Sequence, residues 1–126
     1  MRLLDTDVLV DYLRGSAGAQ AAIRPLAGRE RLLASVVTRT ELIAGMRSAE
    51  KPALEGLFDL LTWIPVSVGI ATRGGELSRR YRGSYPGIGL PDYLIAATAA
   101  VLGAKLWTQN PRHFPMFEGL EPPYRR

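Results

Sequence analysis

Short apolar runs alternate along the chain with longer segments in which apolar residues recur every three or four positions. The short runs predict buried strands over residues 2–4, 31–35 and 105–108, the last as an inner strand. The longer segments predict helices over residues 8–14, 17–26, 38–47, 52–61, 70–82 and 91–102. Residues 62–66 are β-like but contain Pro65, which favours an edge strand. This alternation predicts helices packed against a mainly parallel sheet.

Residues with known helix-end preferences mark several boundaries. Asp7 is suited to cap the first helix and Gly15 to stop it. Pro52 and Pro91 fit the first turns of their helices, where a missing backbone N–H costs nothing. Gly103 fits the position that follows the last helix. Glycine and proline predict irregular structure in two stretches: residues 83–89 and the segment from residue 110 onward.

The length and composition predict a single domain spanning residues 1–126. This length suits one hydrophobic core, and 47% apolar with 22% charged residues is not the composition of a disordered chain. The absence of cysteine excludes disulfides and thiolate metal sites and fits a reducing compartment. No stretch approaches the roughly 18 apolar residues of a membrane span, and no signal peptide is evident, so we expect a cytoplasmic protein.

The positive charge of the chain is carried almost entirely by arginine. The formal net charge is +4, and fourteen arginines stand beside two lysines. Because arginine contacts phosphate through two parallel hydrogen bonds, this balance favours a nucleic-acid partner. On charge alone, a merely basic protein without such a partner is an equal alternative. The candidates for holding phosphates are Arg79, Arg80, Arg82 and Arg112.

Acidic residues gather where a parallel sheet would bind a ligand, outside the carboxyl ends of its strands. Three of the five aspartates, Asp5, Asp7 and Asp11, fall in one short stretch that begins where the first strand ends. Asp92 opens the last helix on its sheet-facing side, and Asn110 follows the last strand. These placements predict a polar site at that edge of the sheet.

Carboxylates that converge on one point need a cation. Two unit charges about 4 Å apart repel by roughly 4 kcal/mol at an effective dielectric constant of about 20, and a divalent ion removes that repulsion. Oxygen ligands favour Mg²⁺ or Mn²⁺, whereas zinc would require histidine or cysteine. The only histidine is His113, which we expect to be structural. A metal held by carboxylates near arginines suits hydrolysis of a phosphodiester.

Each acidic candidate also has a purely structural alternative. Asp5 would serve as the cap of the turn that follows it, and Asp92 as a charge complementing the helix dipole. Glu41, a further candidate for the acidic site, would close a capping box with Thr38. Asp11 is expected to be solvated or hydrogen-bonded locally. The residues alone leave these alternatives open.

Four segments, in order, resemble the motifs of PIN-domain proteins, specifically the VapC-type toxins of bacterial and archaeal toxin–antitoxin systems. They are residues 3–15 (LLDTDVLVDYLRG), 40–45 (TELIAG), 90–99 (LPDYLIAATA) and 107–114 (WTQNPRHF). Each motif is weak by itself, but together they span nearly the whole chain in the expected order. The sequence is therefore similar to this family along its full length.

The resemblance implies a fold, an activity and partners. The fold would be a PIN-like three-layer α/β/α sandwich with a central, mainly parallel sheet. The activity would be that of a Mg²⁺-dependent endoribonuclease, with Mn²⁺ as a plausible substitute, cleaving single-stranded or loop RNA. The family also implies a homodimer and a cognate antitoxin that covers the active-site groove.

The resemblance assigns roles to individual residues as well. Asp5 and Asp92 would be the main metal ligands, and Glu41 would complete the acidic cluster directly or through water. Asn110 would be the fourth catalytic residue at a position that is often aspartate in the wider family. Because asparagine is neutral, a second metal would be held more weakly. Two threonines would support the site by hydrogen bonding: Thr6 and Thr108.

Two other functions fit parts of the same pattern. Residues 5–8 match the D-x-D-x-[T/V] motif of haloacid-dehalogenase-type phosphatases, with Asp5 as the nucleophile and Asp7 as the acid–base. That chemistry also needs a lysine and a later acidic pair, neither of which stands in a fitting place. A non-catalytic RNA-binding PIN-like module would be equally basic, but it would be expected to have lost part of the acidic set.

Overall fold

Four short parallel strands form the central sheet of the computed structural model, which describes residues 1–126. They are β1 (Arg2–Leu4), β2 (Leu32–Ser35), β3 (Thr62–Ile64) and β4 (Lys105–Trp107). The strand order is β3-β2-β1-β4, and each adjacent pair is parallel. The sheet predicted from the alternation of strands and helices is confirmed, and it is parallel throughout.

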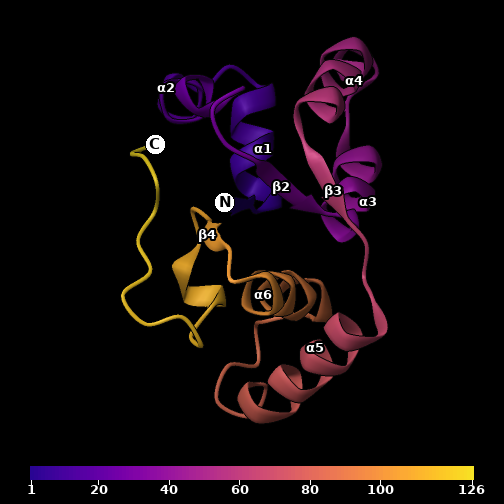
Figure 1. Ribbon diagram of the computed structural model, residues 1–126, viewed down its shortest axis with the longest axis vertical. Coiled ribbons are helices and arrows are strands. Elements are labelled where there is room, and N and C mark those ends of the chain that lie inside the picture. The colour runs from indigo at the N-terminus through magenta and orange to yellow at the C-terminus, as the bar shows by residue number, and fades with distance from the viewer.

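Six helices cover the two faces of this sheet. They are α1 (Thr6–Leu13), α2 (Ala17–Ile23), α3 (Val36–Gly45), α4 (Lys51–Leu60), α5 (Val68–Tyr81) and α6 (Leu90–Leu102). In Figure 1, α1, α2 and α4 lie on one side of the sheet, while α6 lies on the other with α5 outside it. The arrangement is the expected three-layer α/β/α sandwich. None of the helices combines the length and apolar character needed to cross a bilayer.

Alternate strand residues build two separate cores. Leu4 and Leu32 point into a cluster with residues of α1, α2, α3 and α4. Leu3 and Leu33 point to the opposite face, where residues of α6 cover them. Successive side chains of a strand point to opposite faces, so both faces of these strands are buried and their sequences are continuously apolar.

Three helices, α1, α3 and α5, each begin two residues earlier than their sequence patterns predict, and the first two follow a strand directly. Asp5, not Asp7, caps α1: its side chain accepts the N–H of Thr6 at 2.8 Å. Ser35 caps α3 in the same way, accepting the N–H of Val37 at 3.1 Å. Both α1 and α3 therefore start directly at the end of a strand, and the capping box of Thr38 and Glu41, the structural alternative for Glu41, does not form. The prediction for Gly103 is confirmed, since it follows α6 in the left-handed conformation with φ of 64°.

The two edges of the sheet are formed by β3 and β4. The edge position predicted for β3 from Pro65 is confirmed, whereas the inner position predicted for β4 is wrong. The apolar character of β4 has another cause: Phe117 and Leu120 of the segment that follows it pack in the same core as Leu106. Residues 117–123 run beside the strand, so this irregular segment covers the edge where a fifth strand would otherwise lie.

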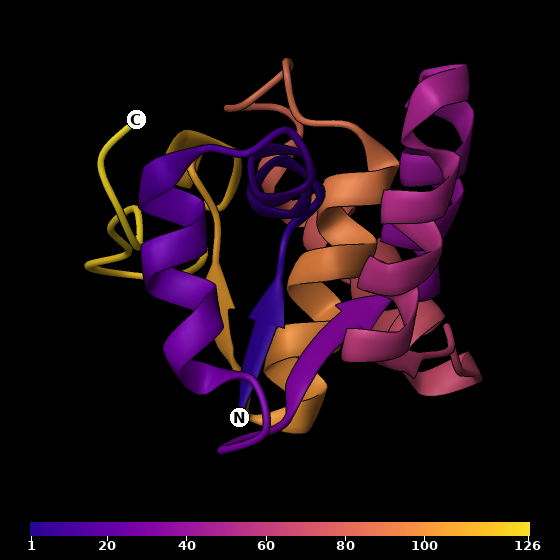
Figure 2. The ribbon, with the colours of Figure 1, turned by 90° about the horizontal axis from the view of Figure 1, so that it is seen from above.

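The order of the strands identifies one end of the sheet as a place for a ligand. From β1 the chain adds β2 and then β3 in one direction, and β4 is placed on the other side of β1. Ligands of open α/β sheets bind where the order reverses, outside the carboxyl ends of the strands. Figure 2 shows the strand arrows pointing toward the same edge, from which α1 begins directly after β1.

Candidate functional site

A polar pocket of about 330 Å³ lies at this edge of the sheet. Its lining residues come from the ends of β1 and β4, from the beginnings of α1 and α6, from α3, and from the C-terminal segment. They are Asp5, Thr6, Asp7, Val10, Glu41, Asp92, Asn110, His113 and Arg126. The acidic residues expected to converge, together with Asn110, do line one pocket although they are far apart in the sequence.

Asp5 lies at the floor of the pocket and is only 6% exposed. Its backbone N–H continues the sheet by donating to the carbonyl of Trp107 at 2.8 Å. Its side chain accepts the N–H of Thr6 at 2.8 Å and the hydroxyl of Thr108 at 2.7 Å. Burial and the charge of Asp7 nevertheless raise the pKa of Asp5 to about 7, because these hydrogen bonds only partly offset them. The charged form of the Asp5 carboxyl group is therefore poorly stabilised by the residues around it.

Asp92 faces the same pocket from the first turn of α6. Its Oδ2 lies 2.9 Å from Nδ1 of His113, which belongs to the short turn Pro111–His113 after β4. Burial raises the pKa of Asp92, and His113 opposes that shift. The histidine expected to be purely structural thus contacts a predicted metal ligand. Through this contact, His113 links the turn that follows β4 to the first turn of α6.

Glu41 reaches the pocket from α3 through a contact with the beginning of α1. Its Oε1 accepts the hydroxyl of Thr6 at 2.7 Å, and that hydroxyl lies 3.0 Å from the hydroxyl of the fully buried Thr38. Thr6 therefore joins α1 to α3 at the site. On the far side of α3, Arg39 lies over the ring of Phe58, 4.3 Å from its centroid, which fixes α3 against α4.

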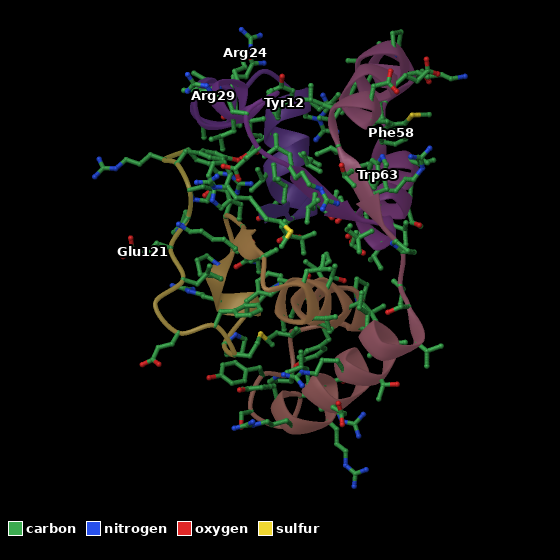
Figure 3. All side chains as sticks on the ribbon, in the orientation of Figure 1. Tyr12, Arg24, Arg29, Phe58, Trp63 and Glu121 are labelled. Carbon is green, nitrogen blue, oxygen red and sulfur yellow. The ribbon has the colours of Figure 1, made fainter.

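The aromatic pair on that side is visible in Figure 3, where Phe58 of α4 and Trp63 of β3 lie together. Their ring centroids are 5.0 Å apart in an edge-to-face arrangement. The indole N–H of Trp63 also donates to the carbonyl of Phe58 at 3.2 Å. This pair joins α4 to β3, and the guanidinium of Arg39 from α3 lies over both rings.

Asp7 is part of the site although the sequence pattern predicted a helix cap. Its Oδ2 accepts the N–H of Gln109 at 3.1 Å, while its buried Oδ1 has no hydrogen-bond partner. Burial raises the pKa of Asp7 as well. The neighbouring Asn110 donates its N–H to the hydroxyl of Thr108 at 3.0 Å, which leaves its amide side chain at the pocket wall.

The donor set of the pocket fits a divalent cation that prefers oxygen. Burial raises the pKa of Asp5, Asp7 and Asp92, which means that their charged forms are poorly solvated in the pocket, and a bound cation would stabilise those charged forms. No three acidic or histidine side chains are gathered closely enough to ligate one ion by themselves. This spacing still suits Mg²⁺, which keeps several waters and is bound directly by one or two carboxylates.

The arginine at the pocket is not one of those expected from the sequence. Arg79, Arg80, Arg82 and Arg112 do not line it, whereas Arg126 does. Other arginines point away from the site, as Arg24 and Arg29 do beside α2 in Figure 3. The local spacing of residues in the sequence gives no signal for this placement, because the C-terminal segment is irregular.

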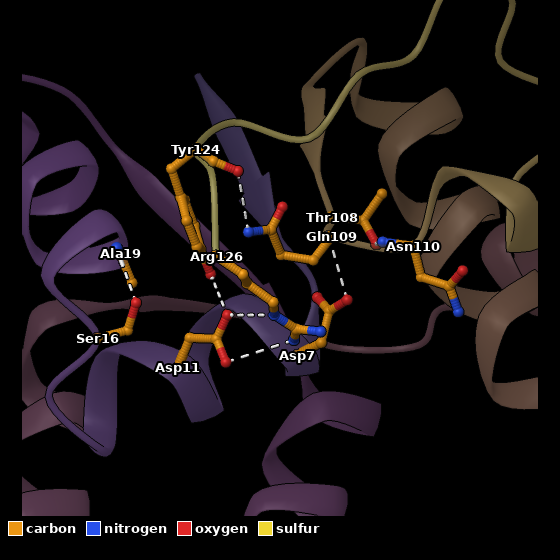
Figure 4. A network of polar contacts seen from close by, with 9 residues as sticks. All are labelled: Asp7, Asp11, Ser16, Ala19, Thr108, Gln109, Asn110, Tyr124 and Arg126. Atoms are coloured by element: carbon orange, nitrogen blue, oxygen red, sulfur yellow. Dashed lines mark hydrogen bonds and ion pairs between the residues drawn. The ribbon is translucent and has the colours of Figure 1, made fainter.

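The expectation that Asp11 is solvated or bonded locally is wrong. Its carboxylate accepts the hydroxyl of Tyr124 at 2.7 Å and pairs with Arg126, 115 positions away in the sequence. Figure 4 shows these contacts beside Asp7 and Gln109. The C-terminal segment is therefore attached to α1 next to the acidic pocket, a contact that no helical spacing could indicate.

Comparisons with known proteins agree with this architecture along the whole chain. Residues 2–117 match the PIN domain family. Ribonuclease VapC19 of Mycobacterium tuberculosis is 50% identical over 125 residues, which cover 98% of this chain and 100% of the relative. Ribonuclease VapC10 of the same organism is 46% identical over 124 residues, which cover 98% of this chain and 93% of the relative.

Solved structures share the fold as well. A chain in a toxin–antitoxin complex from Klebsiella pneumoniae superposes with a TM-score of 0.83 at 26% identity, and the match covers 100% of both chains. A chain in VapBC2 from Rickettsia felis, bound to a DNA fragment from its promoter, superposes with a TM-score of 0.80 at 22% identity and 95% coverage of both. The sheet and the helices that cover it thus belong to a fold with several known examples.

Proposed function

The chain belongs to the PIN-domain family, and we propose that it is the toxin of a toxin–antitoxin pair, a divalent-metal-dependent endoribonuclease. One observation carries the proposal: Asp5, Glu41, Asp92 and Asn110, from four distant segments, line one pocket. The identity of 50% to Ribonuclease VapC19 over nearly the whole chain supports an RNA substrate. The proposal treats residues 1–126 as a single PIN domain.

Mg²⁺, or Mn²⁺ in its place, is the proposed cofactor, held by Asp5 and Asp92 with Glu41 contributing directly or through water. Such an ion would polarise the phosphodiester and make a water molecule more acidic. Thr6 and Thr108 support the site by fixing the carboxylates of Glu41 and Asp5. These hydrogen bonds hold the oxygen atoms in place before substrate arrives.

The remaining pocket residues orient the substrate and the attacking water. His113 holds one oxygen of Asp92, so the carboxylate keeps a fixed direction toward the pocket. Glu41 is exposed and lines the pocket, so its carboxylate would accept a hydrogen bond from a water molecule that attacks the phosphorus. Asn110 contributes a neutral amide, so its side of the pocket attracts a second cation less than a carboxylate would.

The other two functions considered from the sequence are not favoured. A phosphatase of the haloacid-dehalogenase type needs a lysine at the nucleophilic aspartate, and no lysine lines the pocket around Asp5. A non-catalytic RNA-binding module has no need of buried carboxylates with raised pKa values, which destabilise the folded chain at neutral pH. The retained acidic pocket supports an enzyme.

An antitoxin partner and a homodimer are parts of the same proposal. The likeness to a chain of a Klebsiella pneumoniae toxin–antitoxin complex, at 26% identity over 100% of both chains, supports a cognate antitoxin. That antitoxin would cover the acidic pocket and its surroundings. The homodimer follows from the family alone.

Cleavage of RNA by the purified chain tests the proposal directly. A labelled single-stranded RNA is expected to be cut internally with Mg²⁺ or Mn²⁺, and cleavage is expected to stop when EDTA removes the ion. Asp59→Asn is a matched control, since Asp59 is exposed on α4 and outside the pocket, and this variant should cut at the wild-type rate. Cleavage that persists in EDTA, or no cleavage with either ion, would overturn the proposal.

Thr108→Val is expected to weaken Mn²⁺ binding by roughly tenfold. Thr108 is fully buried and donates to Asp5, so its removal takes a hydrogen bond from a carboxylate that already has a raised pKa. Calorimetric titration with Mn²⁺ measures the effect. Thr40→Val, at an exposed position of α3, is the control with the same chemical change. Equal Mn²⁺ affinities for the two variants would contradict the supporting role of Thr108.

A further inference from the structure

The C-terminal segment Tyr124–Arg126 places a guanidinium group at the edge of the acidic pocket. Arg126 lines that pocket. Its Nε donates to Oδ2 of Asp11 at 2.9 Å, and its Nη2 donates to Oδ1 of the same carboxylate at 3.3 Å. In Figure 4 the guanidinium lies between Asp11 and Asp7. The carboxylate of Asp11 in α1 therefore binds the edge of the guanidinium formed by Nε and Nη2.

Three further contacts fix the backbone that carries this arginine. The hydroxyl of Tyr124 donates to Asp11 at 2.7 Å, and the side-chain amide of Gln109 donates to the carbonyl of Tyr124 at 3.1 Å. The third contact is a close approach to Gly18 of α2. A Cβ atom at that position would lie 2.6 Å from the carbonyl oxygen of Arg125 and 2.9 Å from Cδ2 of Tyr124. Only glycine leaves room for the segment there.

The guanidinium keeps part of its hydrogen-bonding capacity free. An arginine has five N–H donors, and Arg126 uses two of them on Asp11 and makes no other hydrogen bond. Its side chain is 59% exposed, so the remaining donors are accessible from the pocket side. It is also the one arginine that lines the pocket, and it lies near Asp7.

We propose that Arg126 binds a phosphate group of the RNA substrate beside the acidic residues, and that Asp11 and Tyr124 are the positioning residues that hold it there. This inference rests on the proposed function. A polyanion entering an acidic pocket needs a fixed positive charge, and a guanidinium offers two parallel hydrogen bonds to phosphate. Arg126 supplies that charge between Asp11 and Asp7, at the rim of the pocket.

Substitution of Arg126 tests the assignment through binding as well as cleavage. The affinity of Arg126→Ala for a fluorescein-labelled single-stranded oligoribonucleotide, measured by anisotropy in EDTA so that no cleavage occurs, is expected to fall roughly tenfold. The slope of log affinity against log salt concentration should decrease by about 0.7, the value for one lost phosphate contact with a single strand. Arg126→Lys should retain part of the affinity, because lysine keeps the positive charge but lacks the planar group that donates two parallel hydrogen bonds.

Arg125→Ala is the matched control. Arg125 is the exposed neighbour of Arg126 and does not line the acidic pocket. Its replacement removes the same formal charge from the same segment, and the RNA affinity should stay within about twofold of wild type. An equal loss in Arg125→Ala and Arg126→Ala would overturn the inference, since the basic segment would then act only through its total charge.

Gly18→Ala tests the positioning without changing any charge. The added methyl group displaces the segment that holds Arg126, while alanine suits the helical position itself. We expect a loss of RNA affinity comparable to that of Arg126→Ala and little further loss in the double variant, because both changes remove the same contact. Fully additive losses would contradict this positioning. Far-ultraviolet circular dichroism checks that the variants are folded.

The outcomes separate this inference from the proposed function. If the wild type cuts RNA and Arg126→Ala binds and cuts it equally well or better, the assignment of Arg126 fails and the enzyme activity stands. If the wild type binds RNA in a manner that depends on Arg126 but does not cut it with Mg²⁺ or Mn²⁺, the enzyme activity fails and the assignment stands. A KM that rises in Arg126→Ala with a smaller change of kcat supports a binding contact.

Discussion

Asp5→Asn is expected to reduce RNA cleavage at saturating Mg²⁺ by at least about 100-fold. Asp5 is the most deeply buried carboxylate of the pocket, at 6% exposure, and asparagine cannot supply its negative charge to a cation. The change leaves the local structure intact, because asparagine caps a helix as well as aspartate does. The side-chain oxygen of the variant can still accept the N–H of Thr6 that Asp5 accepts at 2.8 Å.

Initial rates on a labelled RNA measure this effect, with circular dichroism as the check that the variant is folded. Asp59→Asn makes the same chemical change on the exposed surface of α4 and should leave the rate unchanged. A folded Asp5→Asn protein that cuts RNA within about tenfold of the wild-type rate would show that Asp5 is not a ligand of the essential ion.

In the absence of divalent cations, the free energy of unfolding of the wild type is expected to fall as the pH rises from about 4 to about 7. The pKa of Asp5 is about 7 in the folded chain, against the usual value of 3.8. Below the lower value both states carry the proton, and the stabilising contribution is fully present. Between the two values only the folded chain holds it, so stability falls by about 1.4 kcal/mol for each pH unit.

Above pH 7 this loss is complete, at roughly 4 kcal/mol. Asp5→Asn has no such proton to lose, so the variant should be more stable than the wild type by up to that amount at pH 8. For a domain of this size the difference corresponds to roughly 15 °C in Tm. Burial raises the pKa of Asp7 and Asp92 in both proteins, so this contribution cancels in the comparison, whereas the repulsion of Asp5 by Asp7 acts in the wild type alone.

Urea denaturation in EDTA at pH 5 and pH 8 provides the measurement. The advantage of Asp5→Asn over the wild type should grow by about 2–3 kcal/mol between these two values. Mg²⁺ should restore stability to the wild type at pH 8 and have little effect on the variant, because binding to the folded state alone stabilises it. A wild type that is as stable as the variant at pH 8 in EDTA would show that the buried carboxylate causes no destabilisation.

The sequence predicted the acidic pocket because its position depends on where the strands and helices begin and end. Parallel strands present their carboxyl ends at one edge, so Asp5 and Asn110, which follow two such strands, had to lie near each other. The position of Asp92 followed from Pro91, which marks the first turn of α6. These residues are placed by elements whose existence depends only on local patterns.

Other parts of the site depend on contacts that no local pattern encodes. Asp5 and Asp7 are equally good capping residues by type. Asp5 caps α1 because β1 ends at Leu4, directly before it. The carboxylate of Asp7 instead accepts the backbone N–H of Gln109. The pairing of Asp11 with Arg126 joins residues 115 positions apart through a segment without periodicity. The edge strand β4 resembled an inner strand in the sequence because Leu106 is buried in a core to which Phe117 and Leu120 also belong.

The late position of β4 and the C-terminal segment in the chain has a consequence for synthesis on the ribosome. Thr108 follows Asp5 by 103 positions, and Asn110, His113 and Arg126 come later still, so the pocket has no complete wall until these residues dock. Domains of a growing chain fold as whole units once their sequence has emerged. A nascent chain therefore carries Asp5 long before it has an assembled pocket.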